Sequence, residues 1–200
     1  MTYKKPENVP GLIRNEDGSI LEYYASDVPE GMCIIEIGPF TGKSTAFIAR
    51  GAEPGVKIYT IDPWDMLDVP ISGTGLTIAT DRARAEVLFH DNMQKCGLKD
   101  KVVAVKSFSS DAAAKWAGTI EIGMIYIDGN HKYPGVKADI EDWLPKVAVR
   151  GVAIFDDYRS TAGVRRAVDE FLASHGPTSN SHWIRCDRDD TRFVVLQRES

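Results

Sequence analysis

The sequence has few cysteines, and their spacing excludes two classes of small protein. Its 200 residues contain Cys33, Cys96 and Cys186, an odd number without a C-x-x-C pair. This pattern excludes a scaffold stapled by disulfides and lacks the ligand spacing of a structural zinc site. The three thiols are instead typical of a reduced, cytoplasmic protein.

Long hydrophobic runs and an excess of positive charge are also missing. No stretch approaches the roughly 18 apolar residues of a membrane helix, and no apolar segment follows the basic N-terminal residues as in a secretory signal. We therefore expect a soluble, cytoplasmic protein with no membrane partner. The net charge of −5 argues against nucleic acid as the main partner, because phosphate binding requires a basic surface.

The apolar residues that are present form short, continuous runs, which predict buried strands of a parallel sheet. The runs cover residues 33–37, 56–61, 102–105, 122–127 and 152–155, and helices are expected at 44–50, 81–96, 112–117, 135–144 and 163–175. Residues 182–186 and 192–197 predict a hairpin. The expected fold is α/β, a Rossmann-like, doubly wound, mostly parallel sheet with an antiparallel C-terminal hairpin. We expect residues 1–30 to form an N-terminal extension or lid, and residues 31–200 to form the main domain.

The first predicted strand runs into a glycine-rich turn that begins at Glu36 and ends at Ser44. Gly38 and Gly42 permit a tight turn and a close approach of the backbone to a ligand. The segment G-x-x-x-G-K-S is one residue shorter than a P-loop, and Ile37 stands where the first P-loop glycine belongs. The G-x-G-x-x-G motif of NAD enzymes is absent. The pattern E-x-G-x-x-x-G instead resembles the first motif of class I methyltransferases.

Several residues after the second and third predicted strands are candidates for binding a nucleoside. Asp62 lies twenty residues beyond Gly42, where a Rossmann acid binds ribose hydroxyls, although an acid there can also simply form a turn. Trp64 is a candidate for stacking on an adenine, or an ordinary half-exposed aromatic residue. Ser109 is a candidate for a hydrogen bond to the adenine, and the alternative for this segment is a helix cap.

Three acidic residues follow the fourth and fifth predicted strands. Asp128 ends one strand, and Asp156 and Asp157 end the other. These strands are neighbours in a doubly wound sheet, so we expect the three carboxylates to share a small volume. They repel one another unless a cation is present, and Mg²⁺ prefers oxygen ligands. The pattern predicts a site for Mg²⁺ or another hard divalent cation, with solvated loop acids as the alternative.

His131 lies three residues after Asp128, in the same loop. Histidine is the common general base near neutral pH, so we predict His131 to be the catalytic base. The alternative is a structural histidine.

These segments together resemble the metal-dependent O-methyltransferases related to macrocin and mycinamicin sugar methyltransferases, which are class I enzymes dependent on S-adenosylmethionine (SAM). The resemblance extends over residues 31–172 and rests on the glycine-rich turn and on segments 127–140, 151–158 and 163–168. It implies that residues 31–200 bind SAM, with the first-motif residues around the methionine part and Asp62 at the ribose. It also implies that the three acids bind Mg²⁺ and that His131 is the base. The full set of expected cofactor contacts is Glu36, Gly38, Gly42, Ser44, Asp62, Trp64, Ser109 and Asp128.

The resemblance implies transfer of the SAM methyl group to a hydroxyl of a small molecule, with a sugar or a glycosylated metabolite as the acceptor. Mg²⁺ would lower the pKa of the hydroxyl, and His131 would take its proton. We expect residues 66–80 to close over the substrate, and a homodimer is the default assembly. Two rivals remain: a hydroxylase-like relative on the same scaffold and a non-catalytic relative.

Overall fold

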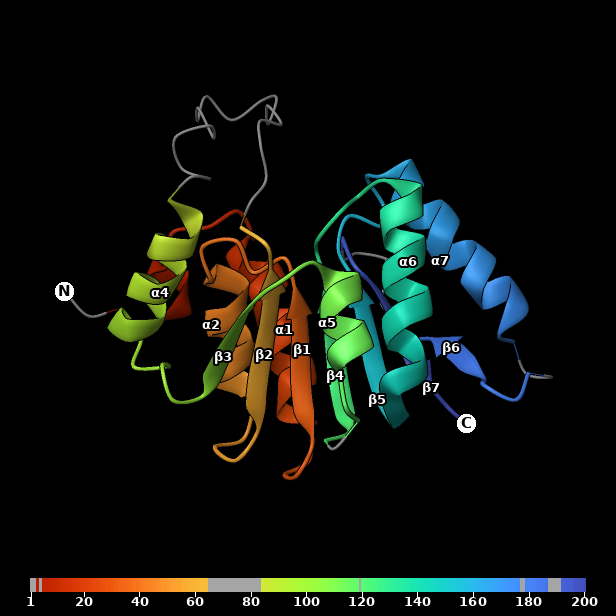
Figure 1. Ribbon diagram of the computed structural model, residues 1–200, viewed down its shortest axis with the longest axis horizontal. Coiled ribbons are helices and arrows are strands. Elements are labelled where there is room, and N and C mark those ends of the chain that lie inside the picture. The colour runs from red at the N-terminus through yellow and green to blue at the C-terminus, as the bar shows by residue number, and fades with distance from the viewer. Residues whose placement is uncertain (1–2, 4, 65–83, 119, 177–178, 187–191) are drawn as a thin grey trace.

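The protein is built around one central sheet (Figure 1), and a computed structural model describes residues 3, 5–64, 84–118, 120–176, 179–186 and 192–200. Within these residues, seven strands form the sheet in the order β3-β2-β1-β4-β5-β7-β6. The first five strands along the chain are parallel: β1 (Cys33–Ile37), β2 (Lys57–Asp62), β3 (Val102–Lys106), β4 (Ile122–Ile127) and β5 (Val147–Phe155). The edge is antiparallel and consists of β7 (Val194–Arg198), which pairs with β5, and β6 (Trp183–Arg185).

Helices cover both faces of this sheet (Figure 1). The core on one face includes residues of α1 (Asn15–Ser26), α2 (Lys43–Gly51) and α4 (Ala85–Lys95). The core on the other face includes residues of α5 (Ser109–Lys115), α6 (Tyr133–Trp143) and α7 (Ala162–Ser174). Short 3-10 turns occupy Pro6–Asn8 and Leu144–Lys146.

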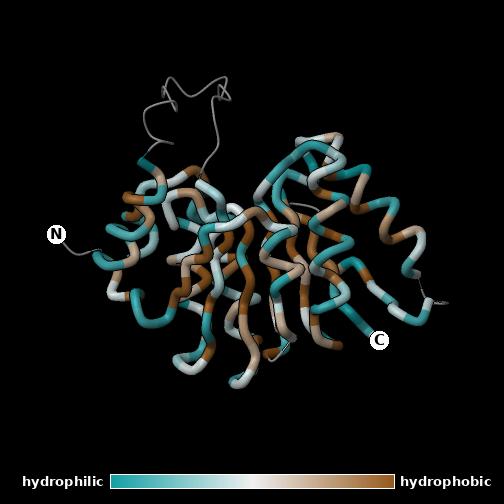
Figure 2. Tube along the Cα trace, in the orientation of Figure 1, coloured by the Kyte–Doolittle hydropathy of each residue, from teal (hydrophilic) through white to brown (hydrophobic). Residues whose placement is uncertain are grey.

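The two helical layers explain the continuous apolar runs of the strands. Successive residues of a strand point to opposite faces, so a strand covered on both faces buries all of them. In β1, Ile34 packs into the core that includes α1 and Ile35 into the core that includes α6, and both are fully buried. Figure 2 shows the hydrophobic residues gathered along the strands in the interior.

The predicted α/β class, the mostly parallel sheet and the antiparallel C-terminal hairpin are confirmed. Strand bounds 33–37 and 122–127 match the structure, whereas β5 begins at Val147 rather than at residue 152. Arg150 and Gly151 interrupt its apolar run, and the pairing with β4 shifts register there, so the first part of the strand gives a weak sequence signal. Helix α5 begins at Ser109 rather than at residue 112. The predicted start is too late because the first turn of the helix is polar and gives no apolar signal.

The predicted N-terminal extension contributes to the core. Leu21 and Ala25 of α1 are fully buried, and a Cβ on Gly51 of α2 would lie 2.1 Å from the carbonyl oxygen of Glu22, so α1 and α2 pack closely. A lid role for residues 1–30 stays a prediction, and the expected closing loop, 66–80, lies outside the described residues. Within the part of the chain that the structure describes, no helix has the length and apolarity needed to cross a membrane.

Candidate functional site

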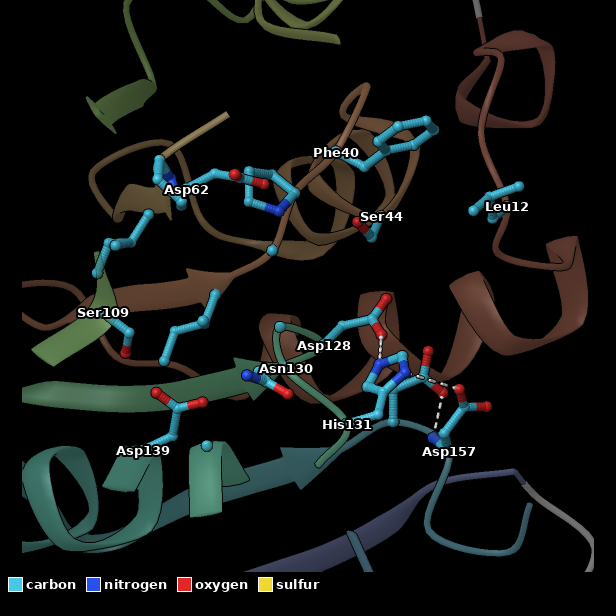
Figure 3. Close-up of a pocket in the computed structure, with 18 of the residues that line it drawn as sticks. Leu12, Phe40, Ser44, Asp62, Ser109, Asp128, Asn130, His131, Asp139 and Asp157 are labelled. Atoms are coloured by element: carbon cyan, nitrogen blue, oxygen red, sulfur yellow. Dashed lines mark hydrogen bonds and ion pairs between the residues drawn. The ribbon is translucent and has the colours of Figure 1, made fainter. Parts of the chain in front are cut away.

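A pocket opens at the carboxyl ends of the parallel strands, where a doubly wound sheet binds its ligands (Figure 3). Its volume is about 670 Å³, which is within the range of cofactor and small-molecule sites. Most of the predicted site residues line it: Gly38, Ser44, Asp62, Trp64, Ser109, Asp128, His131, Asp156 and Asp157.

Three non-glycine residues of the pocket have backbone angles that side chains disfavour. Phe40, Trp64 and Asp157 have φ values of 50°, 47° and 54°. Such conformations cost about 1–3 kcal/mol each and persist where the surrounding structure enforces them, often at functional sites. Their presence around one pocket supports a functional role for it.

The glycine-rich turn is pressed against the end of β4. Gly38 has a φ of +82°, and a Cβ on it would lie 2.2 Å from the carbonyl oxygen of Asp128. The amide N–H of Asp128 donates a hydrogen bond to the carbonyl oxygen of Ile37 at 2.9 Å. The glycine-rich turn and the loop that carries His131 are therefore fixed to each other.

Two of the predicted cofactor contacts lie behind the turn and do not line the pocket. Gly42, with a φ of +89°, precedes α2 and packs against Phe89 and Met93. Glu36 is fully buried, and the hydroxyl groups of Ser44 and Thr45 each donate a hydrogen bond of 2.5 Å to its carboxylate. In this structure both residues shape the turn and the start of α2.

Burial raises the pKa of Glu36 to about 7, from an ordinary value of 4.5. Between these pH values the folded protein holds a proton that the unfolded chain has released. Raising the pH through this window therefore lowers the free energy of unfolding, by an amount on the order of 3 kcal/mol.

We expect the Glu36→Gln variant to lack this pH dependence, because glutamine does not ionise. Urea unfolding of both proteins at pH 5 and pH 8 measures it. The stability of the variant relative to the wild type should increase between the two pH values. Parallel pH profiles would contradict the account of a carboxyl group that is protonated when buried.

Asp62 and Trp64 border the pocket together at the end of β2. The amide N–H of Trp64 donates to Oδ1 of Asp62 at 2.7 Å, and the indole Nε1 donates to the carbonyl oxygen of Phe40 at 3.1 Å. Asp62 therefore forms a turn, as the alternative interpretation expected, and also lines the pocket. The indole ties the chain after β2 to the glycine-rich turn.

Ser109 has a buried carboxyl neighbour that the sequence analysis did not identify. The indole Nε1 of Trp143 donates to Oγ of Ser109 at 2.9 Å, and Ser109 in turn hydrogen-bonds Asp139. Asp139 lines the pocket, and burial raises its pKa to about 6. A signal was present in the sequence, since Asp139 interrupts the apolar stripe that Val136, Ile140 and Trp143 form on α6.

The three predicted acids meet beyond the ends of β4 and β5. The phenol oxygen of Tyr126, which is fully buried, lies 3.1 Å from Oδ2 of Asp156 and 3.3 Å from Oδ2 of Asp128. Asp156 is only 2% exposed, and burial together with the charge of Asp128 raises its pKa, while the guanidinium of Arg192 opposes this shift. The expected convergence of the carboxylates is confirmed in position.

His131 lies between two of these acids (Figure 3). Its Nε2 is 3.1 Å from Oδ1 of Asp128, and its Nδ1 is 3.5 Å from Oδ2 of Asp157. The hydrogen bond to Asp128, followed by the nearby negative charges, raises the pKa of the imidazole, although burial opposes the shift. The predicted base therefore has a defined orientation at the pocket.

The arrangement of the acids does not fit the predicted magnesium site. Among the described residues, no group of three or more histidine, cysteine, aspartate or glutamate side chains is placed to hold one metal ion. Asp156 and Asp157 instead form ion pairs with Arg192, at 2.5 and 2.7 Å. This arginine carries no sequence signal for the site, because it lies in the predicted hairpin, far along the chain from the acids.

The start of α7 supports the loop that carries His131. A Cβ on Gly163 would lie 2.6 Å from the carbonyl oxygen of His131 and 2.8 Å from the amide nitrogen of Tyr133. We expect the Gly163→Ala variant to displace this loop and to lower the free energy of unfolding by about 1–3 kcal/mol, the usual cost of overpacking a methyl group. Urea unfolding of the variant and of the wild type measures the loss. Equal stability of the two proteins would show that this contact does not hold the loop.

Solved structures of methyltransferases share this fold. An O-methyltransferase from Bacillus cereus, in complex with SAH, has a TM-score of 0.67 and 17% sequence identity over 96% of this chain and 85% of that chain. The O-methyltransferase TomG from Streptomyces achromogenes, involved in tomaymycin synthesis and solved with SAM, has a TM-score of 0.67 and 19% identity over 94% and 82%. An rRNA methylase from Streptococcus thermophilus has a TM-score of 0.62 and 14% identity over 95% and 100%. At these identities the likeness establishes the fold alone.

Sequence comparison assigns the family. A segment of 36 residues is 44% identical to the uncharacterized protein y4gI of Sinorhizobium fredii, but it spans only 18% of this chain and 4% of that protein. The model of the methyltransferase domain matches residues 35–158, more than half of the chain. This span includes the glycine-rich turn, Asp62, His131 and the three acids. The chain belongs to the methyltransferase-domain family.

Proposed function

We propose that this protein transfers the methyl group of SAM to a hydroxyl oxygen of a small molecule. The observation that carries the proposal is the placement of His131 at the pocket, between Asp128 and Asp157. Membership of the methyltransferase family supports the transfer, and O-methyltransferases are among the proteins that share its fold.

The described residues fit SAM. The pocket extends from Asp62 and Trp64 at the end of β2, past the glycine-rich turn, to the acids at the ends of β4 and β5. A carboxylate at the end of β2 suits the two ribose hydroxyls, and Ser109 and Asp139 offer hydrogen-bonding groups to a base. When bound, SAM would supply a methyl group on a sulfonium, which is a good leaving group.

His131 would remove the proton of the acceptor. Asp128 faces Nε2 at hydrogen-bond distance, so it favours the tautomer that carries its proton on Nε2 and leaves Nδ1 to act as the base. Nδ1 of His131 would take the hydroxyl proton and pass it to solvent, and the methyl group supplied by bound SAM would end on the acceptor oxygen, leaving a methyl ether and the demethylated cofactor.

Positioning would supply much of the remaining rate. Holding the oxygen, the methyl group and the sulfur in line can contribute about 7–11 kcal/mol. The contact between Gly38 and Asp128 fixes the glycine-rich turn relative to the loop of His131. In this proposal, the turn would face SAM and His131 would face the acceptor. This rigid connection is the means by which the fold would align the two substrates.

Two finer features of the function are the chemical class of the acceptor and the need for a metal ion. We propose a polar small molecule, with a sugar hydroxyl as the class that the family resemblance implies, and no nucleic acid. Asn130 and Lys43 line the pocket and offer hydrogen-bond donors to such an acceptor. Since the acids do not form a magnesium site in this structure, the proposed step uses no metal, and magnesium dependence is tested directly.

The test is methyl transfer from SAM carrying a trideuterated methyl group to a panel of sugars, phenols and polyketide alcohols, each assayed with Mg²⁺ and with chelator. Mass spectrometry locates the label. We expect a labelled methyl ether from at least one hydroxyl acceptor. A label on nitrogen, carbon or RNA would contradict the proposal, and SAM binding without transfer to any acceptor would favour a non-catalytic relative. A hydroxylase-like relative would not consume SAM.

A further inference from the structure

An arginine of the C-terminal hairpin reaches the acidic cluster, which we define as Asp128, Asp156 and Asp157. Strand β7 pairs with β5 in antiparallel register, with Val194 opposite Phe155. Arg192 precedes β7 by two residues and therefore lies beside the two acids that follow β5. The pairing of the strands thus fixes a positive charge next to the cluster.

The contacts of Arg192 are those of a strong ion pair. Its Nε lies 2.5 Å from Oδ1 of Asp156, and its Nη2 lies 2.7 Å from Oδ1 of Asp157. The arginine side chain is 27% exposed and that of Asp156 only 2%. Charge-assisted hydrogen bonds of this length are strong, and a guanidinium keeps its charge at any physiological pH.

The remaining contacts of Asp156 are also with hydrogen-bond donors. The amide N–H of Asp157 donates to its Oδ1 at 2.7 Å, and the phenol of Tyr126 donates to its Oδ2 at 3.1 Å. With Arg192, three donors thus surround one carboxylate that has about four lone-pair sites. Mg²⁺ requires near-octahedral oxygen ligands and would be repelled by the adjacent guanidinium, so Arg192 would have to leave before Asp156 could bind it.

We propose that Arg192 supplies to the acidic cluster the positive charge that a divalent ion supplies in metal-dependent relatives, so that this enzyme needs no metal. The inference rests on the proposed methyl transfer only where it says that activity needs no metal. Which cation neutralises the acidic cluster is a property of the folded protein and can be measured without activity. Arg192 is a positioning residue. It holds Asp157, which in turn lies 3.5 Å from Nδ1 of His131.

The experiment measures Mn²⁺ binding directly, by electron paramagnetic resonance of the free ion, for the wild type and the Arg192→Met variant. Methionine fills similar space without charge. We expect no stoichiometric binding by the wild type and one Mn²⁺ per chain for the variant, at an affinity at least tenfold higher. The control is Arg198→Met, which removes an arginine of β7 that bonds the carbonyl oxygens of Pro145 and Val147 rather than the acids, and which should behave as the wild type.

Stoichiometric binding of Mn²⁺ by the wild type would overturn the inference. Absence of binding by both folded proteins would also contradict it, because removing the guanidinium would then uncover no cation site. If the variant does not fold alone, recovery of its helical circular dichroism on addition of Mn²⁺ supports the inference and failure to recover contradicts it. None of these outcomes depends on turnover, so the inference and the proposed function can fail separately.

Discussion

Replacing His131 by glutamine should lower the rate constant of methyl transfer by about 10²- to 10⁴-fold, the usual contribution of a positioned general base. Glutamine keeps a polar side chain but cannot accept the proton of the acceptor hydroxyl. Because the imidazole lies among the acids rather than near Asp62, the dissociation constant of SAM should change less than a few-fold. Single-turnover kinetics with saturating SAM measure the rate, and calorimetry measures the affinity.

The matched control is His182→Gln, because His182 precedes β6 and does not line the pocket. It should retain the full rate. A His131→Gln protein that binds SAM and keeps most of its activity would show that the proton leaves by another route.

Replacing Gly38 by alanine should abolish measurable SAM binding and destabilise the protein by about 2–5 kcal/mol. Two costs combine: the left-handed backbone conformation, about 1–2 kcal/mol, and the overpacking of a methyl group, about 1–3 kcal/mol. The methyl group would lie 2.2 Å from the carbonyl oxygen of Asp128, which belongs to rigid backbone at the end of β4. Chemical unfolding and calorimetric titration with SAM measure the two effects.

Gly97→Ala separates the two costs. Gly97 also has a positive φ, +70°, but a Cβ there has no neighbour within 4 Å. It should lose only the conformational part of the stability and keep its affinity for SAM. If Gly38→Ala were as stable as Gly97→Ala and bound SAM normally, the close contact between the turn and Asp128 would not matter for the site.

The parts of the fold that could be predicted are those with local signals. The apolar runs of β1 and β4 mark their strands because both faces of the sheet are covered, and the acids that follow β4 and β5 meet because the two strands are neighbours. Asp62 lies at the end of β2 and the glycine-rich turn at the end of β1, which are neighbouring strands, and both border the pocket. In each case, residues close in sequence, or neighbouring strands, determine the outcome.

The features that could not be predicted depend on long-range packing. Arg192 meets Asp156 only because β7 pairs with β5 in one particular register, and two acids with an arginine remote in sequence give no motif. Glu36 was predicted to contact the cofactor, which stays a prediction, and the hydrogen bonds that its carboxylate accepts from Ser44 and Thr45 of α2 depend on packing. A sequence pattern identifies such an acid without showing which side of the loop it faces.

The central claim is that this pocket binds SAM, and calorimetric titration of SAM into the purified protein tests it most directly. The titration is made both with Mg²⁺ and with chelator, for the wild type and for Asp62→Ala. The account predicts one SAM per chain, a dissociation constant unaffected by chelator, and at least tenfold weaker binding by the variant. Absence of SAM binding to the folded wild type, with or without Mg²⁺, would contradict the account.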